Sequence, residues 1–135
     1  MTKEKAQGLG LKPLAKVKGW ATVGVDPQYM GIGPVPAVSL LLNRSGLQMG
    51  DIGQIELNEA FAAQALAVIR EARMNMEKVN VNGGAIAQGH PLGATGAVII
   101  TKLIHELRFR REQFGIATLC VGGGQGMAIL LENMS

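Results

Sequence analysis

The sequence predicts an α/β domain built on a mixed five-stranded β-sheet with helices on both faces. β-prone runs alternate with helical runs along the chain in the order β-α-β-α-β-α-β-β. Alternation of this kind gives a mostly parallel sheet with right-handed crossovers and helices on its faces. Only a short glycine turn separates the last two strands, so we expect them to form an antiparallel hairpin that makes the sheet mixed.

The chain is long enough for one domain. It has 135 residues, of which 47% are apolar, and this is sufficient for a real core. Residues 1–14 are polar and interrupted by glycines, so we expect an N-terminal tail or connecting segment there and the domain over residues 15–135. The expected strands are residues 17–25, 51–57, 79–82, 115–121 and 127–131, and the expected helices are residues 37–44, 59–73 and 93–107.

Turn and stop signals divide the first half of the chain. The first strand ends at Asp26-Pro27, a turn signal. Prolines then open the first helix, and Ser45-Gly46 supplies its C-terminal stop. The second strand alternates weakly between polar and apolar residues, and the helix after it is rich in alanine, the strongest helix former.

Glycine clusters divide the second half. The short third strand is followed by a glycine loop that carries His90, and the helix after this loop is apolar nearly all round in its first half. Such a helix is usually buried on several sides. The fourth strand ends at Cys120, a turn of sequence GGGQG follows, and the final strand returns antiparallel. His105, farther along the helix, is expected on its surface.

Composition excludes several classes of function. The net charge is only +3, the basic residues are scattered and there is a single tyrosine, so we do not expect nucleic-acid binding. Cys120 is the only cysteine, which excludes a disulfide and argues against a metal site. No signal peptide and no apolar run of about 18 residues is visible. We therefore expect a soluble, cytoplasmic protein without a membrane partner.

Three residues lie where α/β sheets usually place their sites, beyond the carboxyl ends of strands: Asn58, His90 and Cys120. The glycine loop around His90 feeds a helix N-terminus, an arrangement that lets backbone N–H groups approach an anionic ligand. A glycine-rich turn with a structural histidine is the alternative. The coincidence of the three positions favours a catalytic domain.

Each candidate also has a purely structural interpretation. Asn58 either caps the following helix or offers its amide to a water or an oxyanion. His90 is either a structural histidine or a proton acceptor. Cys120 is either a small buried hydrophobe or a nucleophile or acid–base thiol. The glycines from Gly122 to Gly124 form either a simple hairpin turn or a set of N–H donors for an oxyanion.

Three motifs make the chain resemble the thiolases, which are the acetyl-CoA acetyltransferases and 3-ketoacyl-CoA thiolases. NEAFAAQ (58–64), NGGAIAQGHPLGATGA (82–97) and CVGGGQG (120–126) resemble the three C-terminal signatures of this family. MGIGPVPA (30–37) and LGLKPLA (9–15) also resemble its connecting segments. The resemblance covers nearly the whole chain, and the combination of motifs in this order is highly specific.

The resemblance implies a fold of two similar halves, each a mixed five-stranded sheet, stacked into five α/β layers. This chain resembles only the C-terminal half. The apolar helix after His90 resembles the central helix of the family, which packs against its counterpart from the other half. The N-terminal half is therefore an expected partner. Alone, the exposed helix would favour a homo-oligomer.

The resemblance also implies roles for the three candidates in acyl transfer between acyl-CoA molecules. His90 would be the base that activates a nucleophilic cysteine. Cys120 would be the acid–base thiol that takes a proton from the α-carbon of the second acyl-CoA and protonates the leaving thiolate. Asn58 would hold the water which, with His90, stabilises the thioester oxygen of the enolate.

The remaining family assignments concern the oxyanion hole and the substrate arm. The N–H of Gly122 would contribute to a second oxyanion hole, and Ala60 and Phe61 would lie near the pantetheine arm. The family uses no metal and no redox cofactor, and coenzyme A enters as substrate or product. This places the expected activity in fatty acid metabolism.

One departure from the family pattern is large. The acyl-accepting cysteine of the family lies in its N-terminal half, and Cys120 matches the second cysteine instead. The chain is therefore expected to be inactive alone, whether as an excised domain, a truncated gene product or one subunit of a split enzyme. The alternative is a non-catalytic module of thiolase fold that binds acyl-CoA or a protein partner.

Overall fold

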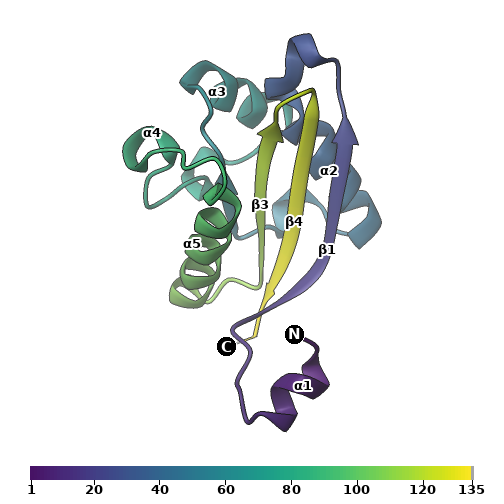
Figure 1. Cartoon of the computed structure of the whole chain (residues 1–135), viewed down its shortest axis with the longest axis vertical. Helices are drawn as coiled ribbons and strands as arrows, with labels where there is room; N and C mark the ends of the chain where they lie inside the picture. The colour runs from purple at the N-terminus through teal and green to yellow at the C-terminus, as the bar shows by residue number, and fades with distance from the viewer. Residues whose placement is uncertain (135) are drawn as a thin grey trace.

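A mixed β-sheet organises the chain, and a computed structural model describes it over residues 1–134 (Figure 1). The described residues form a four-stranded sheet of order β1-β4-β3-β2. Its strands are β1 (Ala15–Gly24), β2 (Gln54–Leu57), β3 (Phe114–Val121) and β4 (Gln125–Asn133). β2 and β3 pair in parallel, whereas β4 pairs antiparallel with both β3 and β1. Three strands thus share one direction, as expected, but β4 lies between two of them and makes two of the three pairings antiparallel.

The expected fifth strand at residues 79–82 is wrong. Val79 makes only an isolated parallel bridge with Ile55, and Asn80 has a φ of 49°, which turns the chain out of the extended conformation. The Asn80 side chain replaces the missing strand. Its Oδ1 accepts from the Leu57 N–H at 2.9 Å, and its Nδ2 donates to the Leu57 carbonyl at 2.8 Å. One asparagine therefore satisfies the outer edge of β2, and the sheet ends there.

Helices cover both faces of the sheet, as predicted. α2 (Pro34–Ser45) packs on one face, where Leu41 meets Ile116 and Leu130 in the larger core cluster. α5 (Thr95–Arg110) packs on the other face, where its leucines meet Ala117 in the second cluster. Ile116 and Ala117 are neighbours on β3, so the two-residue period of the strand divides them between the two layers. Figure 1 shows the two helices on opposite sides of β3.

The remaining helices are short. They are α1 (Lys3–Gly8), η1 (Pro27–Ile32), η2 (Met49–Asp51), α3 (Ala62–Glu71), η3 (Met76–Lys78) and α4 (Ala85–Gln88). α3 begins three residues later than predicted because Phe61 is extended, with φ −148° and ψ 148°. His105 is exposed on α5, as expected. Among residues 1–134, no helix has the length and apolarity needed to cross a bilayer.

The two hydrogen bonds from Asn80 to Leu57 predict a strong effect of substitution. Asn80→Ala leaves two backbone groups of a buried residue unpaired and forces alanine into a left-handed conformation, so we expect a loss of about 2–4 kcal/mol in unfolding free energy. Asn80→Gly removes the same hydrogen bonds without the conformational strain and is expected to lose less. Urea unfolding of both variants measures the difference. Wild-type stability in Asn80→Ala would contradict the role given to this side chain.

Candidate active site

The candidate residues gather at the edge where β1, β2 and β3 end. The Asn58 N–H donates to the Thr118 carbonyl at 3.0 Å, so the β2–β3 ladder continues one residue beyond β2. Cys120 lies on β3 just before the hairpin. The loop with His90 joins α4 to α5 above this edge. The sheet thus brings all three sequence candidates to one end of the domain.

The side chain of Asn58 is buried and has no protein partner. Only 1% of the residue is exposed, yet neither Oδ1 nor Nδ2 makes a hydrogen bond. The helix-cap interpretation is wrong, because Phe61 occupies the N-cap position of α3. A buried amide without a partner costs free energy, and such groups are uncommon unless a water, ion or ligand binds them.

A small cavity lies against Asn58. Its volume is about 20 Å³, enough for one water molecule. Its walls come from the end of β2, from the glycine loop and from the first turns of α5, including Gly84, Gly89, Pro91 and Thr95. Asn58 and both sequence neighbours of His90 therefore line the same space.

His90 is exposed, and its ring is oriented by Thr95. Nδ1 lies 2.7 Å from the Thr95 Oγ1, and this hydroxyl donates to the Pro91 carbonyl at 3.1 Å. In the tautomer with the proton on Nδ1, Oγ1 accepts from Nδ1–H while its own proton goes to the Pro91 carbonyl. Neutral His90 then carries its lone pair on Nε2, which can accept a proton. Thr95 is 4% exposed, so this orientation is set by a fixed, buried group.

Cys120 is buried, with 8% of the residue exposed. Burial raises the pKa of its thiol above the usual value, so the neutral thiol predominates at pH 7. Its position on β3 shares a face with Ile116, on the α2 side of the sheet, whereas Asn58 lies on the α5 side. Cys120 consequently lies at the same edge as Asn58 without lining the same cavity.

The glycine hairpin after Cys120 has both structural and open positions. Gly123 and Gly124 adopt φ values of 85° and 88°, and a Cβ on Gly124 would lie 2.4 Å from the Val25 carbonyl oxygen. The turn therefore requires these two glycines. Gly122 is different, since it is exposed and no heavy atom lies within 4 Å of the place of a Cβ. Neither crowding nor a left-handed backbone explains a glycine at this position.

The two residues expected near the substrate arm lie at the start of α3. Phe61 is 69% exposed and Ala60 is partly buried. Both directly follow Asn58 and Glu59, so they extend the edge of the site toward solvent. An exposed phenylalanine at this place offers an apolar surface three residues after Asn58, although neither Ala60 nor Phe61 lines the small cavity.

Sequence reasoning missed two groups of the site. Glu56 and Lys102 form a salt bridge of 2.8 Å that lines the cavity next to Asn58. Thr95, which orients His90, was also not anticipated. A glutamate between Ile55 and Leu57 on a short strand was the available signal, because a buried strand carries a charge only when a partner neutralises it.

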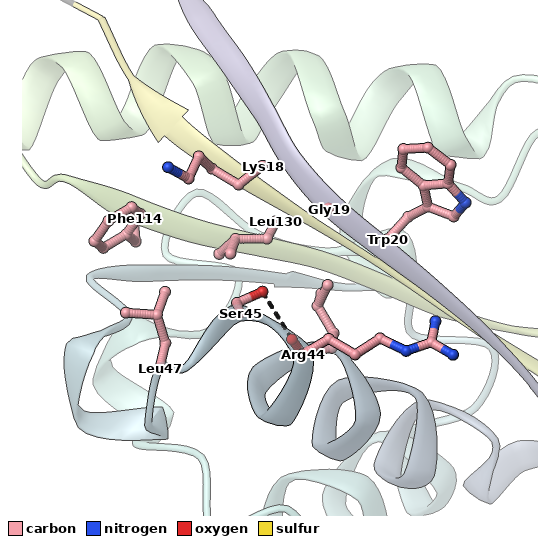
Figure 2. Close-up of a pocket in the computed structure, with 9 residues that line it drawn as sticks. Lys18, Gly19, Trp20, Arg44, Ser45, Leu47, Phe114 and Leu130 are labelled. Atoms are coloured by element: carbon pink, nitrogen blue, oxygen red, sulfur yellow. Dashed lines mark hydrogen bonds between the residues drawn. The ribbon is translucent and has the colours of Figure 1, made fainter.

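A larger cavity lies elsewhere, between β1 and the last turn of α2 (Figure 2). Its volume is about 380 Å³, and its walls include Trp20, Arg44 and Phe114. Ser45 in its wall donates to the Leu41 carbonyl at 2.8 Å. None of the candidate residues lines it, so it is separate from the site at the strand ends.

The raised pKa of Cys120 predicts a specific pH dependence. The unfolded chain loses the thiol proton first, so the stability linked to this group is complete below the unfolded pKa of about 8.5 and is lost as pH rises toward the native pKa. Urea unfolding between neutral and alkaline pH should show this decline, and Cys120→Ala should remove it. An equal decline in the variant would exclude Cys120 as its source.

Comparison with known proteins agrees with the geometry. Residues 11–133 match the family model described as thiolase, C-terminal domain. The 3-ketoacyl-CoA thiolase of Bacillus subtilis is 58% identical over 132 residues, which are 98% of this chain and 34% of that protein. The acetyl-CoA acetyltransferase of Escherichia coli is 53% identical over 135 residues, which are 100% of this chain and 34% of that protein.

Solved structures show the same relation. The acetyl-CoA acetyltransferase of Bacillus anthracis superposes with a TM-score of 0.96 at 51% identity, covering 98% of this chain and 34% of that one. Human mitochondrial 3-ketoacyl-CoA thiolase in complex with CoA has a TM-score of 0.96 at 45% identity, with the same coverage. The chain thus spans about a third of the length of its relatives. It belongs to the thiolase family and corresponds to the C-terminal domain.

Proposed function

We propose that this chain supplies the C-terminal catalytic half of an acyl-CoA thiolase. The reaction is thiolysis of a 3-ketoacyl-CoA or, in reverse, Claisen condensation of two acyl-CoA molecules. The observation that carries the proposal is the buried, unpartnered amide of Asn58 beside a water-sized cavity walled by the His90 loop. A non-catalytic module has no need to maintain such an amide.

In the proposed site, Asn58 and His90 act on the same oxygen. Once Nε2 of His90 has taken the proton of the nucleophilic cysteine, its N–H donates to the thioester oxygen of the enolate. A water bound by the Asn58 amide donates to the same oxygen. The exposed ring, oriented through Thr95, supports this role because Nε2 faces away from the buried hydroxyl. His90 also serves as the base that activates the nucleophilic cysteine.

Cys120 acts as the acid–base thiol of the proposed reaction. In condensation, its thiolate takes a proton from the α-carbon of the second acyl-CoA. The resulting carbanion attacks the acyl group that the nucleophilic cysteine holds as a thioester, so that the carbon–carbon bond forms as the thioester C–S bond breaks. The thiol returns a proton to the leaving thiolate. The raised pKa of Cys120 supports proton donation.

The remaining proposed contacts follow the rim of the site. The Gly122 N–H contributes to a second oxyanion hole, and its open surroundings support close approach by a ligand. Ala60 and Phe61 line the path of the pantetheine arm. Coenzyme A acts as substrate or product, and the proposal includes no metal and no redox cofactor. A cytoplasmic role in fatty acid metabolism belongs to the same proposal.

The nucleophile must come from outside these 135 residues, because Cys120 is their only cysteine. We therefore include a thiolase N-terminal half as partner, on this or another polypeptide. The exposed side of α5 supports this part of the proposal, since Ala94, Ala97, Val98 and Thr101 are all exposed there. Small side chains let another helix approach closely.

The activity test uses acetoacetyl-CoA and the loss of its absorbance on thiolysis. The isolated chain should give no turnover. A chimera in which residues 11–133 replace the matching segment of the Bacillus subtilis thiolase should be active, and Cys120→Ala in that chimera should lower kcat by about 10²–10⁴-fold.

Two outcomes would contradict this assignment. Turnover by the isolated chain, abolished by Cys120→Ala, would make Cys120 the nucleophile. A folded chimera that binds CoA without turnover would favour the non-catalytic module.

Because the Asn58 amide is unpaired, we predict that substitution of this residue lowers activity strongly and stability only slightly. Asn58→Ala should lower kcat of the chimera by about 10²–10³-fold. It should cost no more than about 1 kcal/mol of unfolding free energy, because no hydrogen bond to protein is lost. Asn80→Ala is the matched control, since that amide is paired. A large stability loss in Asn58→Ala would show that the amide is a structural group.

Without its partner half, the exposed side of α5 should drive self-association. We expect light scattering of the isolated chain to show a dimer at high concentration. Ala97→Glu on α5 should shift it toward monomer, and Ala63→Glu, at an exposed position of α3, should not. A monomer mass at all concentrations would refute this expectation.

A further inference from the structure

Lys102 joins three separate parts of the chain through its ammonium group. Its Nζ lies 2.8 Å from Oε2 of Glu56, which is 3% exposed on β2. The same Nζ donates to the carbonyl of Gly83, where the glycine loop begins. A single side chain of α5 therefore links strand β2 to the loop that leads to His90.

Lys102 connects the two chain segments that carry Asn58 and His90 of the proposed site. Glu56 precedes Asn58 by two residues and shares its face of β2. Gly83 lies at the other end of the link, on the chain segment that continues to His90. Lys102 and Glu56 also line the cavity together with Asn58.

A second carboxylate, that of Glu59, contacts the same loop. Oε2 of Glu59 accepts from the Ile86 N–H at 2.9 Å, and Oε1 accepts from Nδ2 of Asn80 at 3.1 Å. The loop backbone is packed against this carboxylate, because a Cβ on Gly84 would lie 2.3 Å from its carbon. Along the chain, Asn58 thus lies between Glu56, which pairs with Lys102, and Glu59, which accepts directly from the loop backbone.

Stability alone is a weak reason for the Lys102–Glu56 pair. Removing two charges from water is costly, and apolar residues of similar volume usually stabilise a fold as well as a buried ion pair does. What apolar residues cannot do is hold the Gly83 carbonyl at a fixed place relative to β2. The Lys102–Glu56 pair is therefore explained by the fixed position that it gives the Gly83 carbonyl rather than by a contribution to stability.

We propose that Lys102 is a positioning residue of the thiolase site, holding the His90 loop in register with Asn58 through Glu56 and the Gly83 carbonyl. This inference rests on the proposed function for its catalytic consequence. The link itself is a property of the chain and can be measured without any turnover.

The first test is hydrogen exchange on the full chain, with Lys102→Met/Glu56→Gln as the variant. This pair of substitutions removes both charges together, so no buried charge is left alone and the fold is retained. Amides of residues 83–90 should exchange about tenfold faster than in wild type, and those of β3 and β4 should be unchanged.

Lys78→Met is the matched control. The Lys78 ammonium also donates to a backbone carbonyl, that of Ile52, at 2.9 Å, but before the start of β2 and away from the site. This variant should leave residues 83–90 unchanged. Wild-type exchange in the double variant, or faster exchange throughout the domain, would overturn the proposal.

The second test measures turnover in the chimera with the Bacillus subtilis N-terminal part. Lys102→Met/Glu56→Gln should lower kcat at least about tenfold with little change in KM, because a loop displaced by about 1 Å costs rate more than binding. Lys102→Arg should recover much of the loss. Unchanged kcat despite faster loop exchange would also overturn the proposal. If the parent chimera is inactive, the proposed function fails, and the exchange result still decides whether Lys102 holds the loop.

Discussion

The buried amide of Asn58 is the constraint on which the site depends. A buried amide with no hydrogen-bond partner of any kind costs about 1–3 kcal/mol, which is a large share of the stability of a small domain. The fold nevertheless places this side chain at the end of β2, closes it from solvent and leaves a water-sized cavity next to it. The fold thus leaves an amide without a protein partner at the place where the proposed chemistry needs a hydrogen-bonding group.

The end of the sheet explains how the His90 loop reaches this amide. A regular strand over residues 79–82 would have carried the chain along β2 for several more residues. Instead, Asn80 pairs with Leu57 through its side chain and turns the backbone at once. The glycines that follow let the chain pass close to Glu59 and Lys102 before it enters α5. The short sheet and the position of His90 therefore have the same cause.

Local sequence signals were sufficient for most of the architecture. Apart from the strand expected at residues 79–82, the order of strands and helices, the glycine hairpin and the placement of helices on both faces follow from periodicity and turn residues that act over a few positions. These signals failed where contacts between residues far apart in the sequence decide the structure. The β-propensity of Val79 and Val81 does not reveal that Asn80 bonds to a residue 23 positions away. Likewise, the pairing of β4 with β1 is set by packing rather than by either segment.

The candidate site, too, could be predicted only in part from the sequence. The positions of Asn58 and Cys120 at strand ends could be predicted, because strand ends are visible in the pattern. His90 was expected after a strand at residues 79–82 that does not form, and it lies instead in the loop between α4 and α5. The hydrogen-bond partners of each side chain could not be predicted. Whether Asn58 caps a helix depends on where α3 begins, and the extended backbone of Phe61 decides this. The link from Lys102 to Glu56 spans 46 residues and is visible only in the folded chain.

The most direct test is a high-resolution crystal structure of this chain, read at the Asn58 side chain. We expect one ordered water in the cavity, within about 3 Å of the amide, and no protein group paired with Oδ1 or Nδ2. An amide rotated onto a backbone or side-chain partner, with no water beside it, would contradict the claim that the fold holds Asn58 ready for the reaction.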